Sequence, residues 1–145
     1  MVLPCLYELA KNRCHFIAEN QQYNNPKSKL DGAYLIYDNE EKHIYYNREY
    51  DFNGGRERVG MGVLIAKYLQ NHDDEVLLNS LKKYIKYVQK NLVCIETGEV
   101  FNDCNYDNSF TRLYNYPWFS LFYIELYKLL RDKNMLEIAY KIMLF

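Results

Sequence analysis

Carboxylates, arginines and aromatic rings gather in and just after two stretches of the chain, about 20–55 and 93–117. Carboxyl groups can act as general acids and bases. Arginine can hold a carboxylate through two parallel hydrogen bonds, and aromatic faces can cover the apolar faces of sugar rings. Together these residue types would suit a site for acidic sugars. The candidates are Asp51 and Asp107, the arginines Arg56, Arg58 and Arg112, and the rings of Tyr116 and Trp118.

Each candidate also has an ordinary structural explanation. Aspartate favours turns, so Asp51 before a Gly-Gly pair and Asp107 in an Asn/Asp-rich stretch could simply form loops. Arg56 and Arg58 oppose the dipole at a helix start, so each needs a partner, either a carboxylate ligand or an acidic neighbour such as Glu49. The aromatic rings could pack in the core or at its rim. The elements that hold these residues must therefore decide between the two interpretations.

The composition indicates one domain, residues 1–145, and excludes several classes of protein. The chain is 49% hydrophobic and 26% charged, which is enough apolar content for a core. Its net charge of −1 argues against a nucleic-acid-binding protein, which normally has a basic excess. The four cysteines have no CxxC pair and no zinc-type spacing with the histidines. We therefore expect no metal, no cofactor and no dense disulfide framework.

The sequence contains no segment typical of a membrane protein. The longest apolar run, 118–130, includes a glutamate and a lysine and is shorter than the roughly 20 residues that a bilayer requires. Neither end resembles a sorting signal, so a cytoplasmic location is the default expectation. The run should instead form a buried helix.

The pattern of apolar residues predicts five helices and one small β-hairpin near 33–46. Two of the helices, 56–71 and 117–131, are apolar nearly all round and should be buried. The helix 73–92 has its lysines away from its apolar face, and we expect its outer surface to be exposed. The first and last helices, about 3–19 and 135–145, are intermediate. This alternation predicts an all-α array of antiparallel helical hairpins in two layers.

A weak internal repeat supports this arrangement. The segment from Tyr68 to Leu77 matches the segment from Tyr127 to Leu136, 59 positions later. The Asp31-Gly32 and Thr97-Gly98 pairs occupy corresponding loops. The repeating unit is longer than a tetratricopeptide or ankyrin repeat of about 33–34 residues. A unit of outer helix, aromatic loop, inner helix and tight turn fits an α/α toroid better.

Two motifs carry a resemblance to a known group of proteins. Arg56-Glu-Arg-Val-Gly-Met-Gly62 and Arg112-Leu-Tyr-Asn-Tyr-Pro-Trp118 each open a buried helix, and both resemble segments of six-hairpin glycosidase-like (α/α)6 toroids. The stretch 122–139 is similar to the joint between inner and outer helices in those enzymes. The resemblance covers about 56–145 well and 1–55 loosely, without a complete catalytic signature. A closed toroid needs six hairpins, and this chain supplies about two and a half. We therefore expect either missing sequence or self-association into a homo-oligomer.

The resemblance implies a carbohydrate-active hydrolase that acts on oligosaccharides. Oligosaccharides that contain uronic acids are one candidate class of substrate. Asp51 and Asp107 would be the catalytic carboxylates, because they stand on successive loops at corresponding ends of adjacent repeats. Arg56, Arg58 and Arg112 would bind substrate carboxylates, and the remaining two candidates, both aromatic, would stack on sugar rings. Two alternatives stay open at this point. One is a non-catalytic helical-repeat scaffold, or an inactive fragment, that binds a partner through its aromatic loops. The other is a lanthionine-cyclase-like toroid, which would require a Cys/Cys/His zinc site that the cysteine spacing does not support.

Overall fold

The computed structural model describes residues 5–45, 54–108 and 115–145. The described residues form five α-helices and one two-stranded antiparallel sheet. The helices are α1 (Leu6–Phe16), α2 (Val59–Leu69), α3 (Glu75–Asn91), α4 (Asn115–Leu130) and α5 (Lys133–Leu144). The strands are β1 (Tyr37–Asp38) and β2 (His43–Ile44), in the register Tyr37↔Ile44 and Asp38↔His43. The predicted all-α class with one small hairpin is confirmed.

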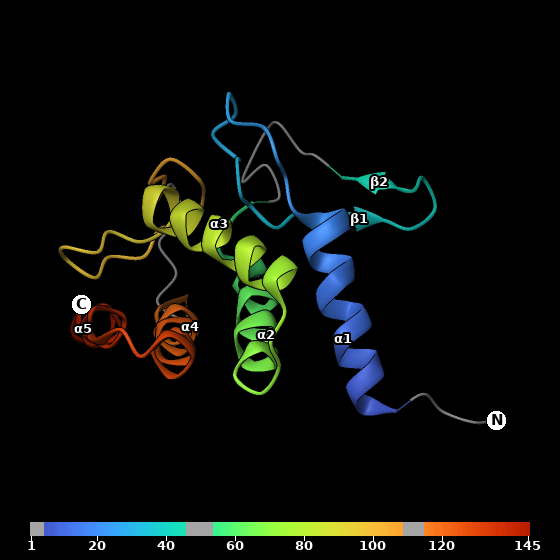
Figure 1. The fold of residues 1–145 in the computed structure, drawn as a ribbon. Helices are drawn as coiled ribbons and strands as arrows, with labels where there is room; N and C mark the ends of the chain where they lie inside the picture. The colour runs from blue at the N-terminus through green and yellow to red at the C-terminus, as the bar shows by residue number, and fades with distance from the viewer. Residues whose placement is uncertain (1–4, 46–53, 109–114) are drawn as a thin grey trace.

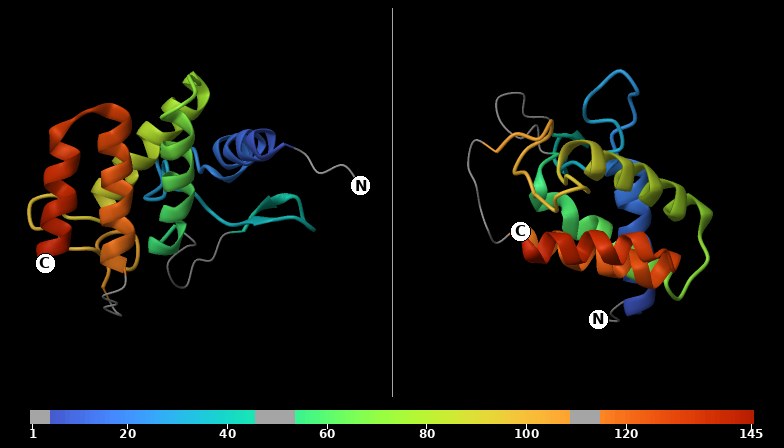
Figure 2. Two further views of the ribbon diagram at one scale, coloured as in Figure 1. Left: turned by 90° about the horizontal axis from the view of Figure 1, so that it is seen from below. Right: turned by 90° about the vertical axis from the view of Figure 1, so that its left-hand side faces the viewer.

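Helices α5, α4 and α2 lie side by side, and α3 crosses them in a second layer (Figures 1 and 2). Helices α2 and α4 run in the same direction, whereas α5 runs back along α4 (Figure 2). Helix α1 packs beside α2 at the opposite edge of the row from α5. The starts of α2 and α4 therefore lie at the same end of the molecule.

Aspartate side chains start the two helices that follow tight turns. Asp74 caps α3 by accepting a hydrogen bond from the Leu77 N–H at 3.1 Å. Asp132 caps α5 by accepting one from the Asn134 N–H at 3.0 Å. Each cap satisfies a backbone donor that has no partner within its helix. Because Asp132 caps the last helix, α5 begins at Lys133, two residues before the predicted start.

An aromatic cluster fills the space between the two layers. The ring of Tyr84, on α3, stacks on Tyr34 at 4.3 Å and meets Phe122 edge-on at 5.7 Å between centroids. Gly62 on α2 lies under these rings, and a Cβ atom there would come within 2.7 Å of Tyr84 and 2.8 Å of Phe122. Gly62 therefore allows the helices to pack closely at this point. Gly60 has no such neighbour within 4 Å.

The loops before α2 and α4 repeat one local design. Each begins with an isolated antiparallel bridge, Gln22↔Tyr34 in one loop and Val93↔Val100 in the other. Two residues before the second partner of each bridge stands a glycine in the left-handed region, Gly32 at φ 87° and Gly98 at φ 88°. Both glycines lie against the backbone of the next outer helix. A Cβ atom would approach a lysine carbonyl oxygen to 2.6 Å at Gly32 and 2.5 Å at Gly98.

The structure corrects the register of the internal repeat by one residue. The two carbonyl groups that face the loop glycines belong to Lys83 and Lys141, and the two capping residues are Asp74 and Asp132. Both pairs are 58 positions apart, not the predicted 59. The one-residue shift lies in the turns. The turn from Tyr68 to the capping Asp74 is one residue longer than the turn from Tyr127 to the capping Asp132.

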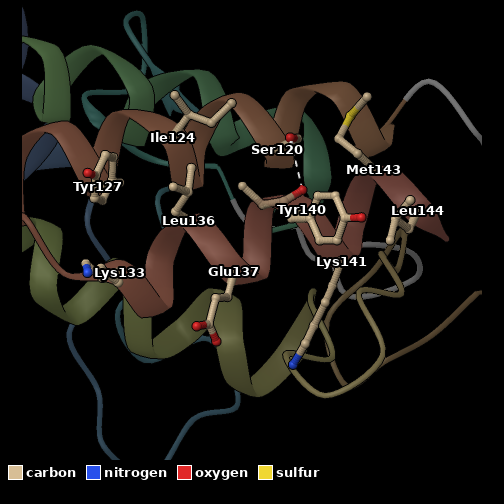
Figure 3. Close-up of a pocket in the computed structure, with 11 residues that line it drawn as sticks. Ser120, Ile124, Tyr127, Lys133, Leu136, Glu137, Tyr140, Lys141, Met143 and Leu144 are labelled. Atoms are coloured by element: carbon tan, nitrogen blue, oxygen red, sulfur yellow. Dashed lines mark hydrogen bonds between the residues drawn. The ribbon is translucent and has the colours of Figure 1, made fainter.

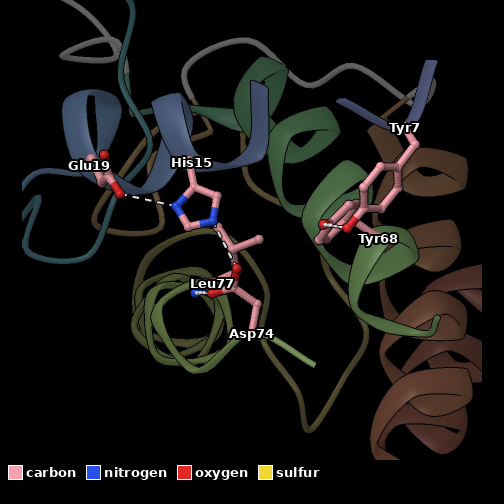
Figure 4. Close-up of polar contacts among 6 residues, drawn as sticks. All are labelled: Tyr7, His15, Glu19, Tyr68, Asp74 and Leu77. Atoms are coloured by element: carbon pink, nitrogen blue, oxygen red, sulfur yellow. Dashed lines mark hydrogen bonds and ion pairs between the residues drawn. The ribbon is translucent and has the colours of Figure 1, made fainter. Parts of the chain in front are cut away.

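Helix α1 is joined to α3 by an imidazole that the sequence did not single out. His15 Nε2 lies 2.8 Å from Asp74 Oδ2, and His15 Nδ1 lies 3.0 Å from Glu19 Oε1 (Figure 4). Both ring nitrogens face carboxylate oxygens, which only accept, so both bonds form only when the ring is the doubly protonated cation. The hydrogen bond to Glu19, with Asp74 adding to it against burial, raises the pKa of His15. His15 therefore has a structural role in joining α1 to the start of α3.

Other sequence expectations had mixed outcomes. Helix α4 is less covered than predicted, since Trp118 and Leu121 on it are 42% and 44% exposed. Cys14 is buried, and burial raises the pKa of its thiol to about 11. Cys5 is exposed. No helix in the described part of the chain is long and apolar enough to cross a membrane.

Candidate functional site

The start of α2 and the start of α4 together enclose a small pocket at the end of the molecule where both helices begin. Its volume is about 270 Å³, and its walls come from both helices. Gly60 leaves open space on the α2 side, and the ring of Trp118 forms the opposite wall. The Glu57 carboxylate lies at the rim. The other lining residues are Val59, Val63 and Leu121.

Arg56 precedes the pocket residue Glu57 in the chain and is 6% exposed. One guanidinium nitrogen, Nη2, pairs with Glu57 Oε1 at 2.9 Å. The other, Nη1, donates to the backbone carbonyl of Asn102 at 3.4 Å, and the Arg56 N–H donates to the same carbonyl at 3.1 Å. The third donor, Nε, is buried and has no partner among the described residues. Arg56 thus ties the 101–108 loop to the start of α2 and keeps one donor unused.

Two buried asparagines extend this polar cluster to α4. The Asn115 side-chain amide donates to Asn102 Oδ1 at 2.8 Å, and neither residue is more than 2% exposed. The Nδ2 donor of Asn102 and the Oδ1 acceptor of Asn115 have no partner in the part of the chain that the structure describes. A buried polar atom without a partner costs about 1–3 kcal/mol. Arg56, Asn102 and Asn115 therefore form a buried cluster with unused hydrogen-bonding capacity.

Arg58 follows one residue later and is half-buried. Its charge lies close enough to the buried Tyr84 ring to lower the pKa of that phenol, but burial has the larger effect and holds the pKa well above its usual value. The Tyr84 hydroxyl has no hydrogen-bond partner within the described segments. Two cations, Arg56 and Arg58, therefore lie at the start of α2, separated by Glu57.

The remaining predicted residues do not all join this cluster. Asp51 and Arg112 lie outside the described residues. Asp107 is exposed on the 101–108 loop, where the Asp103 N–H donates to its backbone carbonyl at 3.1 Å. Tyr116 is 8% exposed, and its ring stacks on Phe145 with centroids 5.6 Å apart. Trp118 is the aromatic residue of the predicted set that faces the pocket.

Sequence reasoning missed Asn102 and Asn115. Asparagine is common in loops and at helix starts, so neither residue stood out from the Asn-rich stretch around it. A buried amide pair becomes visible only when the loop and the helix are brought together. In the described ranges no group of three or more His, Cys, Asp or Glu side chains is arranged to hold a metal ion.

Comparison with known proteins gives a match among solved structures. No family model matches the chain, and no curated protein matches it. Among solved structures, a chain described as a polysaccharide lyase matches 99% of this chain with 34% sequence identity and a TM-score of 0.89. The match covers 22% of that chain, so this protein spans less than a quarter of its length. The fold is thus one that occurs as a segment of a carbohydrate-active enzyme.

Proposed function

We propose that this chain is part of an enzyme that binds and cleaves polysaccharides containing uronic acids, and that its helices belong to an (α/α) toroid. The likeness to a polysaccharide lyase over 99% of the chain carries this proposal. At 34% identity the likeness includes the side chains as well as the backbone path.

The pocket between α2 and α4 would receive one sugar ring. Trp118 offers an exposed aromatic face, and Gly60 allows a ring to approach the α2 backbone closely. Indole faces pack well on the C–H groups of a sugar, and the pocket volume of about 270 Å³ suits one or two rings. Trp118 therefore retains its predicted role as a stacking surface, whereas the burial of Tyr116 favours packing.

The buried cluster, which is joined to the pocket residue Glu57 through Arg56, would recognise a uronate carboxylate. The Nε of Arg56 and the Nδ2 of Asn102 are donors without a partner among the described residues, and a carboxylate is the strongest acceptor that a sugar can bring to them. Arg58 and Arg112 remain candidates for the same task. No metal is needed for this recognition.

Two cleavage reactions fit such a substrate. In elimination, a base removes the proton from the carbon next to the carboxylate, the glycosidic C–O bond breaks, and a C=C bond forms. The leaving oxygen takes up a proton from an acid. In hydrolysis, one carboxyl group protonates the leaving oxygen while a second activates water or attacks the sugar. We favour elimination because the matched protein is described as a lyase. Hydrolysis would rely on Asp51 and Asp107.

The two reactions are distinguished by their products. Elimination creates a double bond conjugated with the carboxylate, which absorbs ultraviolet light, whereas hydrolysis creates a reducing end without that absorbance. The longest polypeptide that contains residues 1–145 should be incubated with uronate oligosaccharides while both signals are followed. We expect matched increases in absorbance and reducing ends. Reducing ends without absorbance, lost in Asp51→Asn or Asp107→Asn, would instead establish hydrolysis.

Binding can be tested on the chain itself. We expect Trp118→Ala to weaken binding of a uronate oligosaccharide about tenfold, since stacking on one ring contributes on the order of 1 kcal/mol. Tyr140→Ala is a matched control, because Tyr140 is an exposed aromatic residue on α5 that does not line the pocket. Equal weakening in both variants, or no binding of any oligosaccharide, would favour the non-catalytic scaffold.

A further inference from the structure

A second cleft, separate from the Trp118 pocket, lies between α3 and the loop 24–32. Its volume is about 350 Å³, and it shares no lining residue with the pocket between α2 and α4. Four lysines surround it. Lys83, Lys86 and Lys90 come from α3, and Lys29 comes from the loop on the other side.

The three α3 lysines form a stripe along one face of the helix. Their spacing of three and four positions brings successive side chains to the same side, where like charges oppose each other by a few tenths of a kcal/mol per pair. Lys86 and Lys90 are exposed and form no ion pair with any residue that the structure describes. Lys83 Nζ donates to Asn24 Oδ1 at 2.8 Å across the cleft.

The acidic residue at this cleft offsets only one of the four lysine charges. Asp31 is the acidic residue among those lining it, and its carboxylate already accepts the Asn25 N–H at 2.8 Å. The chain as a whole has a net charge of −1, so four cations around one depression are not a consequence of composition. A concave surface of one charge concentrates the field and raises the local concentration of an oppositely charged ligand.

Hydrogen bonds and close packing connect the loop 24–32 to α3 at the floor of the cleft. Gly32 rests against the Lys83 backbone, and its N–H donates to the Tyr23 carbonyl at 2.8 Å. The Gln22 side chain donates to the Gly32 carbonyl at 3.2 Å and to the Ser80 carbonyl at 2.9 Å. The Tyr87 hydroxyl, also at the cleft, donates to the Gly54 carbonyl at 2.8 Å. The loop and α3 are therefore held together without the lysine charges.

We propose that this lysine cleft binds the anionic groups of an acidic polysaccharide, carboxylate or sulfate, at a distance from the cleavage site. The inference rests on the proposed function for its choice of a polysaccharide. Lysine ammonium groups are point charges on flexible stems, without the planar fork of arginine. The cleft should therefore respond to the number of negative charges on the ligand more than to their geometry, and would hold a long substrate while its cleaved part occupies the Trp118 pocket.

The test is a binding titration of the whole chain with four probes of equal length: a uronate oligosaccharide, a sulfated oligosaccharide, a neutral oligosaccharide and single-stranded DNA. We expect both acidic oligosaccharides to bind, with affinity falling as salt rises, and the neutral one to bind weakly. Lys86→Gln combined with Lys90→Gln should weaken acidic binding about tenfold at low salt. Lys82→Gln is the matched control, since Lys82 is exposed on the same helix outside the cleft, and should change nothing.

The outcomes separate this inference from the proposed function. Unchanged binding in the double variant, or equal loss in Lys82→Gln, would overturn the cleft while leaving cleavage and the Trp118 result intact. Absence of cleavage by the longer polypeptide, together with loss of binding in the double variant, would overturn the proposed enzyme and leave the anion cleft standing. Tighter binding of DNA than of either acidic oligosaccharide would contradict the choice of ligand.

Discussion

The α2–α3 pair and the α4–α5 pair are two copies of one unit, and they differ in what covers them. With the offset of 58, Ser80, Leu81 and Tyr84 on α3 correspond to Ile138, Ala139 and Ile142 on α5. All six are buried. Both units therefore bury the same helix face against their own loop and inner helix. This part of the unit is complete within each copy.

The second face of the unit is covered in the first copy and open in the second. Helix α4 packs against α2 and covers that side of the first copy, whereas Ile124 and Tyr127 on α4 itself are half-exposed. Ile124 and Tyr127 line an apolar groove of about 850 Å³ between α4 and α5, together with exposed residues of α5 such as Tyr140 and Met143 (Figure 3). The comparison indicates that a unit of this kind needs a following unit to bury its second face.

The loop glycines test whether the two copies share one design. Gly32→Ala and Gly98→Ala should each lower the free energy of unfolding by about 2–4 kcal/mol, because the left-handed conformation and the approach to a lysine carbonyl are both unfavourable with a Cβ atom. Chemical denaturation would measure both. Gly60→Ala is the control. Gly60 is exposed on α2 with nothing within 4 Å, so alanine should add up to about 1 kcal/mol. A harmless Gly98→Ala would show that the second loop is not packed as the first.

Two leucines at corresponding positions test the open face. Leu78 on α3 is half-buried against the core, whereas Leu136 on α5 is 44% exposed. Leu78→Ala should lower the unfolding free energy by about 2 kcal/mol and Leu136→Ala by less than 1 kcal/mol. Equal losses would mean that something covers the groove in solution. Light scattering would then show whether a second copy is responsible, as the expected self-association requires, and Leu136→Ala should reduce that association.

Helix positions, helix types and the β-hairpin could be predicted from the sequence because they follow local patterns. Apolar residues at helical spacing marked α2 to α5, and the Asp-containing turns marked the breaks between helices. The one-residue error in the repeat arose because matching letters, Asp73 with Asp132, outweighed the capping function that Asp74 performs.

The site was less predictable because it depends on contacts between distant segments. Trp118 and Arg56 were both candidates by residue type, but Trp118 is partly exposed whereas Arg56 is buried. The Asn102–Asn115 hydrogen bond joins a loop to a helix start, and no spacing of residues in the sequence predicts it. The His15–Asp74 contact likewise joins residues 59 positions apart. Residue types indicated a class of ligand, whereas the partners of each side chain required the structure.

Substitutions at or beside the two capping aspartates should change the unfolding free energy by intermediate amounts. Asp74 caps α3 and also accepts from His15, whereas Asp132 caps α5 without a histidine. Burial raises the pKa of Asp74, but hydrogen bonds from the Leu77 N–H and His15 outweigh it, so the pKa is lowered. We expect His15→Ala to cost about 1–2 kcal/mol of unfolding free energy near pH 5.5. Asp132→Ala should cost about 1 kcal/mol, with little change from pH 5 to 8.

The pH dependence of the unfolding free energy follows from the directions in which the pKa values of His15 and Asp74 are shifted. Because the folded-state pKa of His15 is raised, its contribution is complete below its unfolded value of about 6.5 and is lost as pH rises through the folded value. Because the folded-state pKa of Asp74 is lowered, its contribution is complete above about 3.9 and is lost as pH falls through its folded value. The cost of His15→Ala should therefore be greatest between about pH 4 and 6.5 and fade by pH 9. A cost that is constant up to pH 9 would exclude the ionic bridge.

The smallest expected change in stability concerns the hydroxyl of Tyr84, which the corresponding residue of the second copy lacks. Tyr84 on α3 corresponds to Ile142 on α5, and the Tyr84 hydroxyl is buried without a partner among the described residues. Tyr84→Phe removes that unsatisfied group and keeps the ring contacts with Tyr34 and Phe122, so it should raise the unfolding free energy by up to about 1 kcal/mol. Tyr34→Phe is the matched control: its hydroxyl bonds to Ser80 Oγ at 2.9 Å, and its removal should cost about 1 kcal/mol. Parallel thermal denaturation of the two variants would decide. A loss of stability in Tyr84→Phe as large as that in Tyr34→Phe would mean that the Tyr84 hydroxyl has a partner after all, and that the first copy depends on a polar contact that the isoleucine of the second copy cannot make.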